Sequence, residues 1–365
     1  MIRSNTKTYL TLLALVLCIA FPASAQISTA KVTGGTVEGV VKDGIASFKG
    51  IPFAAPPVGD LRWRPPQPVI SWKGVRKADK YAPACMQDTG LLTKLGGPPK
   101  ISEDCLYLNV WTGAKDSSER RPVMVWIYGG AFAGGATSFP TFDGTNLAKK
   151  GVVLVSVAYR VGPMGFLAHP DLSRESSGAS GTYGIQDQIA GLKWVKENIA
   201  QFGGDPSNVT IFGESAGAIS VGMLVVSPPA RGLFHRAISE SGGAVAPARG
   251  TLRAAEEQGK AFLEKLKAND IKTARMLSAE TILQNTKEAR VSFWPVADNV
   301  TVMANPYELF EAGKFNDTPI LVGTNSHEGR LFAPQKITSA EFEQMIRKNY
   351  AAAADLLLKV YPHAT

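Results

Sequence analysis

A short apolar strand, a serine between glycines and a small-residue helix follow one another at residues 209–224, and this succession constrains the fold most. The central pentapeptide, residues 213–217, is Gly-Glu-Ser-Ala-Gly. Its glycines lack the Cβ atoms that would collide where strand and helix backbones pass close together. We expect a tight turn that strains Ser215 and lifts its hydroxyl clear of the backbone, toward the N-terminus of the helix. Alone, the pattern also fits a glycine-rich turn that happens to hold a serine.

Further apolar runs alternate with helical patterns along the chain. Residues 123–128 form a continuous apolar run, typical of a strand buried on both faces. Apolar residues recur every three or four positions over 185–202, which predicts an amphipathic helix that ends at Gly203 and Gly204. Together they predict an α/β fold with a mostly parallel central sheet and helices on both faces. The other predicted strands are residues 106–111, 152–157, 209–212, 236–240 and 320–323.

The regions outside this alternation have patterns of their own. Residues 32–54 predict an antiparallel N-terminal meander. The proline-rich residues 56–68 hold Trp63, and we interpret them as a structural wrap over the core. Residues 86–101 predict a surface loop. The polar, helical composition of residues 252–289 predicts a helical cap inserted between two strands.

Residues 1–25 have the pattern of a secretory signal peptide. Arg3 and Lys7 supply the positive start, and an apolar run at 9–21 is too short to span a bilayer. Residues 23–25, Ala-Ser-Ala, favour cleavage before Gln26. Large Leu17 before Cys18 argues against a lipoprotein anchor. We therefore expect a secreted or periplasmic protein without a membrane span.

The cysteines and the charge distribution indicate a disulfide and exclude one class of partner. Cys85 and Cys105 are close in sequence, and in an exported protein such a pair usually forms a disulfide, the alternative being two buried thiols. The net charge of +8 is scattered, and basic residues do not interleave with aromatic ones as on a nucleic-acid surface. We therefore expect no nucleic-acid partner.

A glycine-rich stretch follows the strand at 123–128. Residues 129–135 are Gly-Gly-Ala-Phe-Ala-Gly-Gly, and such a turn after a buried strand can point several backbone N–H groups at one oxygen. Acyl transfer needs this arrangement because the carbonyl oxygen becomes an oxyanion in the transition state. A phosphate-binding loop fits less well, since the stretch lacks a Gly-Lys-Ser/Thr ending and a G-x-G-x-x-G register. A plain flexible turn is the remaining alternative.

Many segments in order resemble the type-B carboxylesterases, the α/β-hydrolase family that includes bacterial carboxylesterases and cholinesterases. The resemblance runs from about Gly39 to the C-terminus and implies an α/β-hydrolase fold. The segments that carry it are residues 48–54, 103–110, 126–132, 159–162, 187–194, 202–217, 238–242 and 323–329.

The resemblance implies a role for each matching residue. Ser215 would be the nucleophile, and Glu328 would be the acid of a Ser-Glu-His triad, in the chain order that such hydrolases use. Ser241 matches a serine that would make a hydrogen bond behind the reacting groups, and Glu214 matches a buried structural carboxylate. The backbone donors to the oxyanion and the cysteines of the family's first disulfide would be Gly130, Ala131 and Ala216, and Cys85 and Cys105, respectively.

The match departs from the family at the catalytic histidine, which family members carry well downstream of the acid. The four histidines of the chain are His169, His235, His327 and His363, and none matches that position. We therefore expect residues 26–365 to be an α/β-hydrolase domain truncated before the histidine segment and the last sheet strands, and a poor esterase as a fragment.

These observations predict a serine hydrolase of carboxylic esters that needs no cofactor or metal. Its partner would be a small-molecule ester, and a peptidase or lipase would differ in substrate only. A non-catalytic binding or adhesion protein on the same fold is the alternative. Retention of Ser215, the glycine-rich loop and Glu328 together argues against that alternative. The sequence indicates neither the ester nor the oligomeric state.

Overall fold

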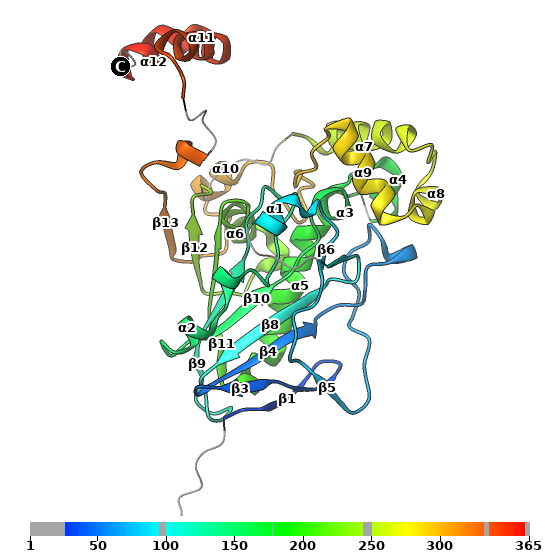
Figure 1. Ribbon diagram of the computed structural model, residues 1–365, viewed down its shortest axis with the longest axis vertical. Helices are drawn as coiled ribbons and strands as arrows, with labels where there is room; N and C mark the ends of the chain where they lie inside the picture. Colours follow the sequence, from blue (N-terminus) through cyan, green and yellow to red (C-terminus); the bar gives the residue numbers. More distant parts are fainter. Residues whose placement is uncertain (1–25, 95–99, 177, 244–249, 332–335, 362–365) are drawn as a thin grey trace, which may run out of the picture.

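The computed structural model describes residues 26–94, 100–176, 178–243, 250–331 and 336–361 (Figure 1). The predicted signal peptide lies outside these residues. Within them, the central feature is an eight-stranded sheet in the order β13-β12-β11-β9-β10-β8-β4-β3. Helices cover both faces of this sheet (Figure 1). The predicted α/β architecture is therefore confirmed.

The central sheet has a parallel half and an antiparallel half. The parallel strands are β9 (Arg121–Ile127), β10 (Val153–Val157), β11 (Gly204–Glu214), β12 (Arg236–Glu240) and β13 (Ile320–Gly323). β8 (Tyr107–Thr112), β4 (Ile45–Pro52) and β3 (Val40–Lys42) pair antiparallel. All five residues of β10 are buried, as expected for a strand covered on both faces.

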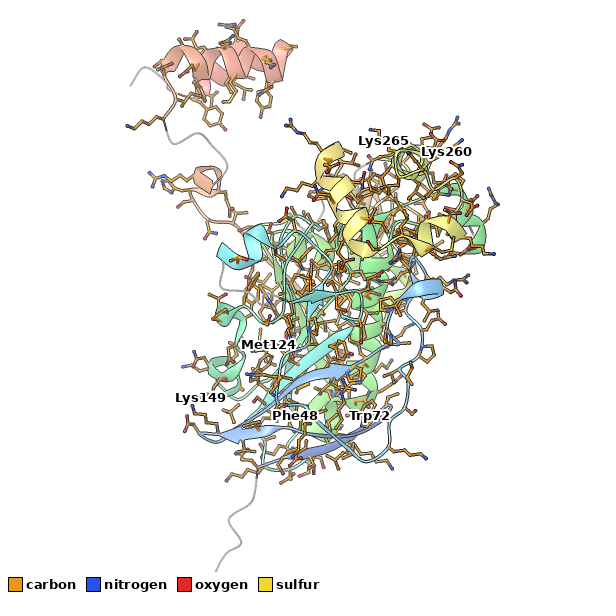
Figure 2. The ribbon with its side chains drawn as sticks, turned by 45° about the vertical axis from the view of Figure 1, so that its right-hand side comes forward. Phe48, Trp72, Met124, Lys149, Lys260 and Lys265 are labelled. Carbon is orange, nitrogen blue, oxygen red and sulfur yellow. A yellow bond between two sulfur atoms is a disulfide. The ribbon has the colours of Figure 1, made fainter. Side chains whose placement is uncertain are left out.

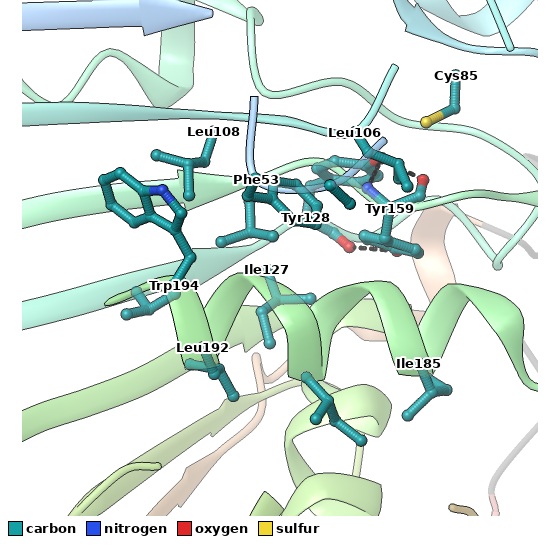
Figure 3. Packing of buried hydrophobic residues seen from close by; sticks show 14 of the residues in the cluster. Phe53, Cys85, Leu106, Leu108, Ile127, Tyr128, Tyr159, Ile185, Leu192 and Trp194 are labelled. Atoms are coloured by element: carbon teal, nitrogen blue, oxygen red, sulfur yellow. Dashed lines mark hydrogen bonds between the residues drawn. The ribbon is translucent and has the colours of Figure 1, made fainter. Parts of the chain in front are cut away.

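Two long helices pack close to the nucleophile turn. The predicted amphipathic helix is α5 (Tyr183–Asn198), extended by a 3₁₀ turn at Ile199–Phe202 and ended by Gly203 in a left-handed conformation. Figure 3 shows Trp194 of this helix beside Leu108 of the sheet. The second helix is α6 (Ala216–Val226), which begins directly after Ser215. The chain thus buries its apolar runs where the sequence pattern placed them.

The N-terminal region differs from the expected single meander. β1 (Thr29–Val32) and β2 (Gly35–Glu38) pair as a hairpin, but they join β5 (Val75–Lys77) in a separate three-stranded sheet. β3 and β4 form a second hairpin within the central sheet. The chain changes sheets at Gly39, where a Cβ atom would lie 2.6 Å from the carbonyl oxygen of Ser47. The expected meander is therefore divided into two hairpins that belong to different sheets.

The predicted surface loop at 86–101 contains a short helix, α1 (Thr89–Lys94), which the loop assignment missed. The Asp88 side chain accepts a hydrogen bond from the N–H of Gly90, which fixes the turn that starts this helix. Short strands β6 (Ala84–Cys85) and β7 (Ile101–Ser102) pair on either side. The predicted disulfide between Cys85 and Cys105 is present and closes the loop.

The helical cap and the proline-rich wrap are joined by buried charges. The cap consists of α7 (Leu252–Lys265), α8 (Ile271–Met276) and α9 (Ala279–Ala289). Arg62 of the wrap forms a bidentate ion pair with Glu103 and donates to three carbonyls at the end of α8. Trp63 is fully buried and donates to the carbonyl of Pro163. These contacts support the interpretation of residues 56–68 as a structural wrap.

Six further α-helices lie within the described residues. α2 (Thr145–Ala148), α3 (Gly162–Phe166), α4 (Pro170–Glu175) and α10 (Pro306–Glu311) are short. α11 (Ser339–Tyr350) and α12 (Ala354–Val360) lie apart from the rest of the ribbon (Figure 1). Figure 2 shows Lys260 and Lys265 on the cap, at the opposite end of the molecule from Phe48 and Trp72. In the part of the chain that the structure describes, no helix has the length and apolarity to cross a membrane.

Candidate active site

Ser215 occupies a strained turn between β11 and α6. Its φ of 54° and ψ of −121° are rarely adopted by residues other than glycine, and its N–H donates to the carbonyl of Glu240 at 2.9 Å. The flanking glycines permit the turn. A Cβ atom on Gly217 would lie 2.1 Å from the carbonyl oxygen of Ile127, and one on Gly213 would lie 2.6 Å from Gly217. The predicted close passage of strand and helix is therefore confirmed.

The glycine-rich loop, residues 129–135, lies against this turn. β9 and β11 are neighbouring parallel strands, so their carboxyl ends meet at one edge of the sheet. A Cβ atom on Gly129 would lie 3.1 Å from the Cβ of Ser215. Gly130, Ala131 and Phe132 all have positive φ, at 117°, 55° and 57°. The loop therefore holds three consecutive residues in an uncommon conformation beside the serine.

The loop leaves backbone donors available. The carbonyl of Gly130 accepts from the N–H groups of Ala133 and Gly134, which closes the turn. Among the described residues, no acceptor is bonded to the N–H of Gly130 or Ala131. Ala216 is the first residue of α6, where an N–H group has no partner within its own helix. Unpaired donors around one serine are suited to binding a developing negative charge.

The Glu328 carboxylate and the groups that donate hydrogen bonds to it form the other side of the site. Glu328 Oε1 accepts from the hydroxyl of Ser241 at 2.5 Å, from the N–H of Asn325 at 2.7 Å and from Asn325 Nδ2 at 3.2 Å. Ser241 follows β12, while Asn325 and Glu328 follow β13. The Ser241 hydroxyl, followed by the Asn325 N–H, holds the pKa of Glu328 below its ordinary value of 4.5. The resemblance implied a hydrogen bond from Ser241 without naming its partner, and in the structure that partner is Glu328.

Glu214 differs from the expected buried carboxylate, because its side chain is exposed. It is the last residue of β11, at the open edge of the site. Partial burial against neighbouring groups, and then the negative charges of Glu328 and Glu240, raise the pKa of Glu214. The pKa values of Glu214 and Glu328 are therefore shifted in opposite directions from the same ordinary value of 4.5.

The described histidines are bonded away from the serine. His169 Nδ1 accepts from the N–H of Asp171, and His235 Nδ1 accepts from the N–H of Val209, well before the end of β11. His327 Nδ1 shares a hydrogen bond with the hydroxyl of Ser326. His363 lies outside the described residues. No histidine of the described chain is hydrogen-bonded to Ser215 or Glu328.

Sequence reasoning missed the residues that support the loop. Phe132 is fully buried, with its ring centroid 5.3 Å from Phe166 and 5.2 Å from Trp294. Gln87 is buried and bonded to both the N–H and the carbonyl of Gly135. These partners come from distant parts of the chain, so no local spacing marks them. Within the described ranges, three or more potential metal ligands are nowhere grouped.

Comparisons with known proteins agree with this geometry. The family model described as "Carboxylesterase family" matches residues 22–360. A fumonisin B1 esterase of Sphingopyxis macrogoltabida is 41% identical over 359 residues, which cover 94% of this chain and 65% of that protein. A para-nitrobenzyl esterase of Bacillus subtilis is 42% identical over 315 residues, which cover 82% of this chain and 62% of that protein. The chain therefore spans under two thirds of the length of either relative.

The solved structures give the same result for the fold. A structure titled as a PNB esterase superimposes with a TM-score of 0.81 at 37% identity, covering 91% of this chain and 71% of that one. A carboxylesterase of Geobacillus stearothermophilus superimposes with a TM-score of 0.80 at 38% identity, covering 88% of this chain and 67% of that one. At these values, the likeness extends over most of the described fold.

Proposed function

Because this chain belongs to the carboxylesterase family, we propose that its protein hydrolyses carboxylic esters through an acyl-enzyme on Ser215. The observation that carries the proposal is the placement of Ser215. Its side chain projects from a strained strand-to-helix turn, beside a loop whose Gly130 and Ala131 N–H groups bond to no described acceptor. A turn that merely connects a strand to a helix does not need this combination.

In the proposed reaction, Ser215 Oγ attacks the ester carbonyl carbon while a base takes its proton. The carbonyl oxygen gains negative charge and receives hydrogen bonds from the N–H groups of Gly130, Ala131 and Ala216. The C–O bond to the alcohol breaks, and the alcohol leaves with the proton. Water then attacks the acyl-enzyme, releasing the carboxylic acid and restoring Ser215.

The base of this proposal is a histidine outside the described residues. The three described histidines are bonded locally, so none has the partners of a triad base. Glu328 is the acid that would orient such a histidine, with Ser241 and Asn325 holding the carboxylate in its charged form. A charged acid suits this task because it stabilises the imidazolium that forms during the reaction.

The substrate is proposed as a small-molecule carboxylic ester, without a choice of acyl or alcohol group. The two relatives are named for different esters, and the pockets that select an ester are built from loops and caps. A secreted or periplasmic location is part of the proposal, supported by the predicted signal peptide and the disulfide. N-terminal sequencing of exported protein tests it, and a start other than near Gln26 contradicts it.

Labelling of the full-length protein with a fluorophosphonate tests whether Ser215 is the nucleophile. We expect mass spectrometry to locate the adduct on Ser215 and the Ser215→Ala variant to lose about a million-fold in turnover of a nitrophenyl ester. Ser207→Ala is the matched control, since it removes an exposed hydroxyl from β11, the strand that leads to Ser215. A folded Ser215→Ala protein with near-normal hydrolysis removes Ser215 from the mechanism. Wild-type protein that is neither labelled nor active supports the binding or adhesion alternative.

A further inference from the structure

We propose that Gln87 is a positioning residue for the glycine-rich loop at 129–135, and that the Cys85–Cys105 disulfide holds Gln87 in place. This inference rests on the proposed esterase function. It adds to that function a residue that touches neither the ester nor Ser215. Gln87 acts through the backbone of the loop that supplies the oxyanion donors Gly130 and Ala131.

The hydrogen bonds of Gln87 define the contact. Its Oε1 accepts from the N–H of Gly135 at 2.7 Å, and its Nε2 donates to the carbonyl of Gly135 at 2.8 Å. The second Nε2 hydrogen is donated to the carbonyl of Cys85 at 2.9 Å. The side chain is 2% exposed, so water does not compete for these bonds. One amide group thus joins the end of the loop to the disulfide.

The loop needs such a partner because its C-terminal end has no side chain of its own. Gly134 and Gly135 are adjacent, and glycine backbones are conformationally free. A side chain would not fit at either position. A Cβ atom would lie 2.7 Å from Gln87 Oε1 at Gly134 and 2.3 Å from the Tyr128 ring at Gly135. The position of this end therefore depends on what bonds to its backbone, and Gln87 bonds to both polar groups of Gly135.

The rest of the loop is already held by other contacts. The carbonyl of Phe132 accepts from the N–H of Gly162 at 2.6 Å, and the Phe132 ring packs between Phe166 and Trp294. Gln87 therefore fixes the far end of a segment in which Gly130, Ala131 and Phe132 have positive φ. Release of that end allows this strained turn to relax, and the turn holds the oxyanion donors.

The disulfide fixes the position of Gln87. Gln87 is two residues from Cys85, which is 1% exposed, and Cys85 is bonded to Cys105 in the segment that enters β8. Apart from the disulfide, the backbone contacts that connect this segment to the residues before β8 are short, namely the β6–β7 pairing and the bond from the N–H of Ala84 to the carbonyl of Lys100. Reduction should therefore shift Gln87 and, through Gly135, the loop.

A displaced oxyanion loop has a distinct kinetic effect. The donors act on the charge that develops in the transition state, so their displacement lowers kcat and leaves substrate binding nearly unchanged. A shift of about 1 Å in such a site can cost about a hundredfold in rate. A purely structural role for Gln87 lowers the amount of folded enzyme instead, and leaves kcat per active site as it was.

Two variants test the proposal in the protein as its gene encodes it. Gln87→Met keeps the side-chain length and removes all three hydrogen bonds, and Gln87→Glu keeps only the acceptor for the Gly135 N–H. The exposed Gln67 lies in the proline-rich wrap, so Gln67→Met is the matched control. Active sites are counted by fluorophosphonate titration. We then measure kcat and KM for a nitrophenyl ester, and the inhibition constant of a trifluoromethyl ketone, which forms a tetrahedral oxyanion on the serine.

We expect Gln87→Met to lower kcat per titrated site about ten- to a hundredfold with KM within about twofold. Ketone binding should weaken by a similar factor, and Gln67→Met should match the wild type. Mild reduction of the wild type to two alkylatable thiols should reproduce the fall in kcat, and this arm stands if the Gln87 variants do not fold. Unchanged kcat per site in folded Gln87 variants, or in the reduced enzyme, overturns the proposal. Loss of activity in the wild type or retention in Ser215→Ala instead overturns the proposed function.

Discussion

The two halves of the site are held in different ways. The inner half consists of Ser215 and the glycine-rich loop. They follow β11 and β9, and each of these strands has a neighbouring strand on both sides in the sheet. The edge half consists of Ser241, Asn325 and Glu328, which follow β12 and β13, and β13 ends the sheet within the described residues. Ile127, just before the loop, is 1% exposed, whereas every residue from 321 to 330 is exposed.

The difference lies in which forces determine the geometry. In the inner half, backbone atoms approach so closely at Gly213 and Gly217 that no side chain fits there. In the edge half, a Cβ atom on Gly323 or Gly329 would meet nothing within 4 Å, and hydrogen bonds to Glu328 hold the residues together. The inner half is therefore fixed by packing. The edge half is fixed by polar contacts that compete with water.

The same substitution in each half gives the largest contrast. We expect Gly217→Ala to destabilise the protein by about 3 kcal/mol, because the new methyl group would overlap the carbonyl oxygen of Ile127. Gly329→Ala should change stability by less than about 0.5 kcal/mol, because the new methyl group meets open space. Urea denaturation of the two variants measures both values.

Equal effects at the two glycines would contradict this contrast. If Gly217→Ala unfolds normally and retains fluorophosphonate labelling of Ser215, close packing does not set the turn. If Gly329→Ala is as destabilising as Gly217→Ala, the edge half is packed against something that the described residues do not include.

The two carboxylates should give opposite dependences of stability on pH. The pKa of Glu328 is lowered in the folded state, so its contribution is present above its ordinary pKa of 4.5 and is lost as the pH falls through the folded value. The pKa of Glu214 is raised, so its contribution is present below 4.5 and is lost as the pH rises through the folded value. Each substitution should flatten one side of the stability curve. Glu328→Gln affects the acid side, and Glu214→Gln affects the side above 4.5.

Denaturation midpoints between about pH 3 and pH 8 measure these slopes. Both effects should be modest, since the two side chains are exposed. Glu328→Gln should also lower the pKa of Glu214, because it removes one of the charges that raise it. A carboxyl NMR titration reads this directly. If both substitutions flatten the same side of the stability curve, or if the Glu214 pKa is unchanged in the Glu328→Gln variant, the two carboxylates do not act on one another.

The inner half was also the easier one to predict from sequence. Its chemistry is local, since a strand, a glycine-flanked serine and a helix within 209–224 already require the close passage seen at Gly217. The contact of Ser241 with Glu328 joins residues 87 positions apart. The family resemblance implied a separate role for each residue and did not indicate this contact. The exposure of Glu214 and the role of Gln87 depend on segments that meet only in the folded chain. The sequence next to Glu214 or Gln87 does not indicate which distant segments each residue contacts.

The smallest expected effect concerns the outer edge of β13. Leu321 and Val322 are 65% and 52% exposed, and among the described residues no strand pairs with β13 on the side away from β12. An apolar edge of this kind pairs readily with other chains, and a lysine on it opposes such pairing. We expect Val322→Lys to change the stability of the 365-residue chain by less than about 0.5 kcal/mol and to lower its self-association in sedimentation velocity. Val41→Lys on β3, the opposite edge strand, is the matched control, since β3 already carries Lys42, and a charged residue on an edge opposes such pairing. If the two variants reduce self-association equally, general surface charge is responsible and the β13 edge has no special part in it.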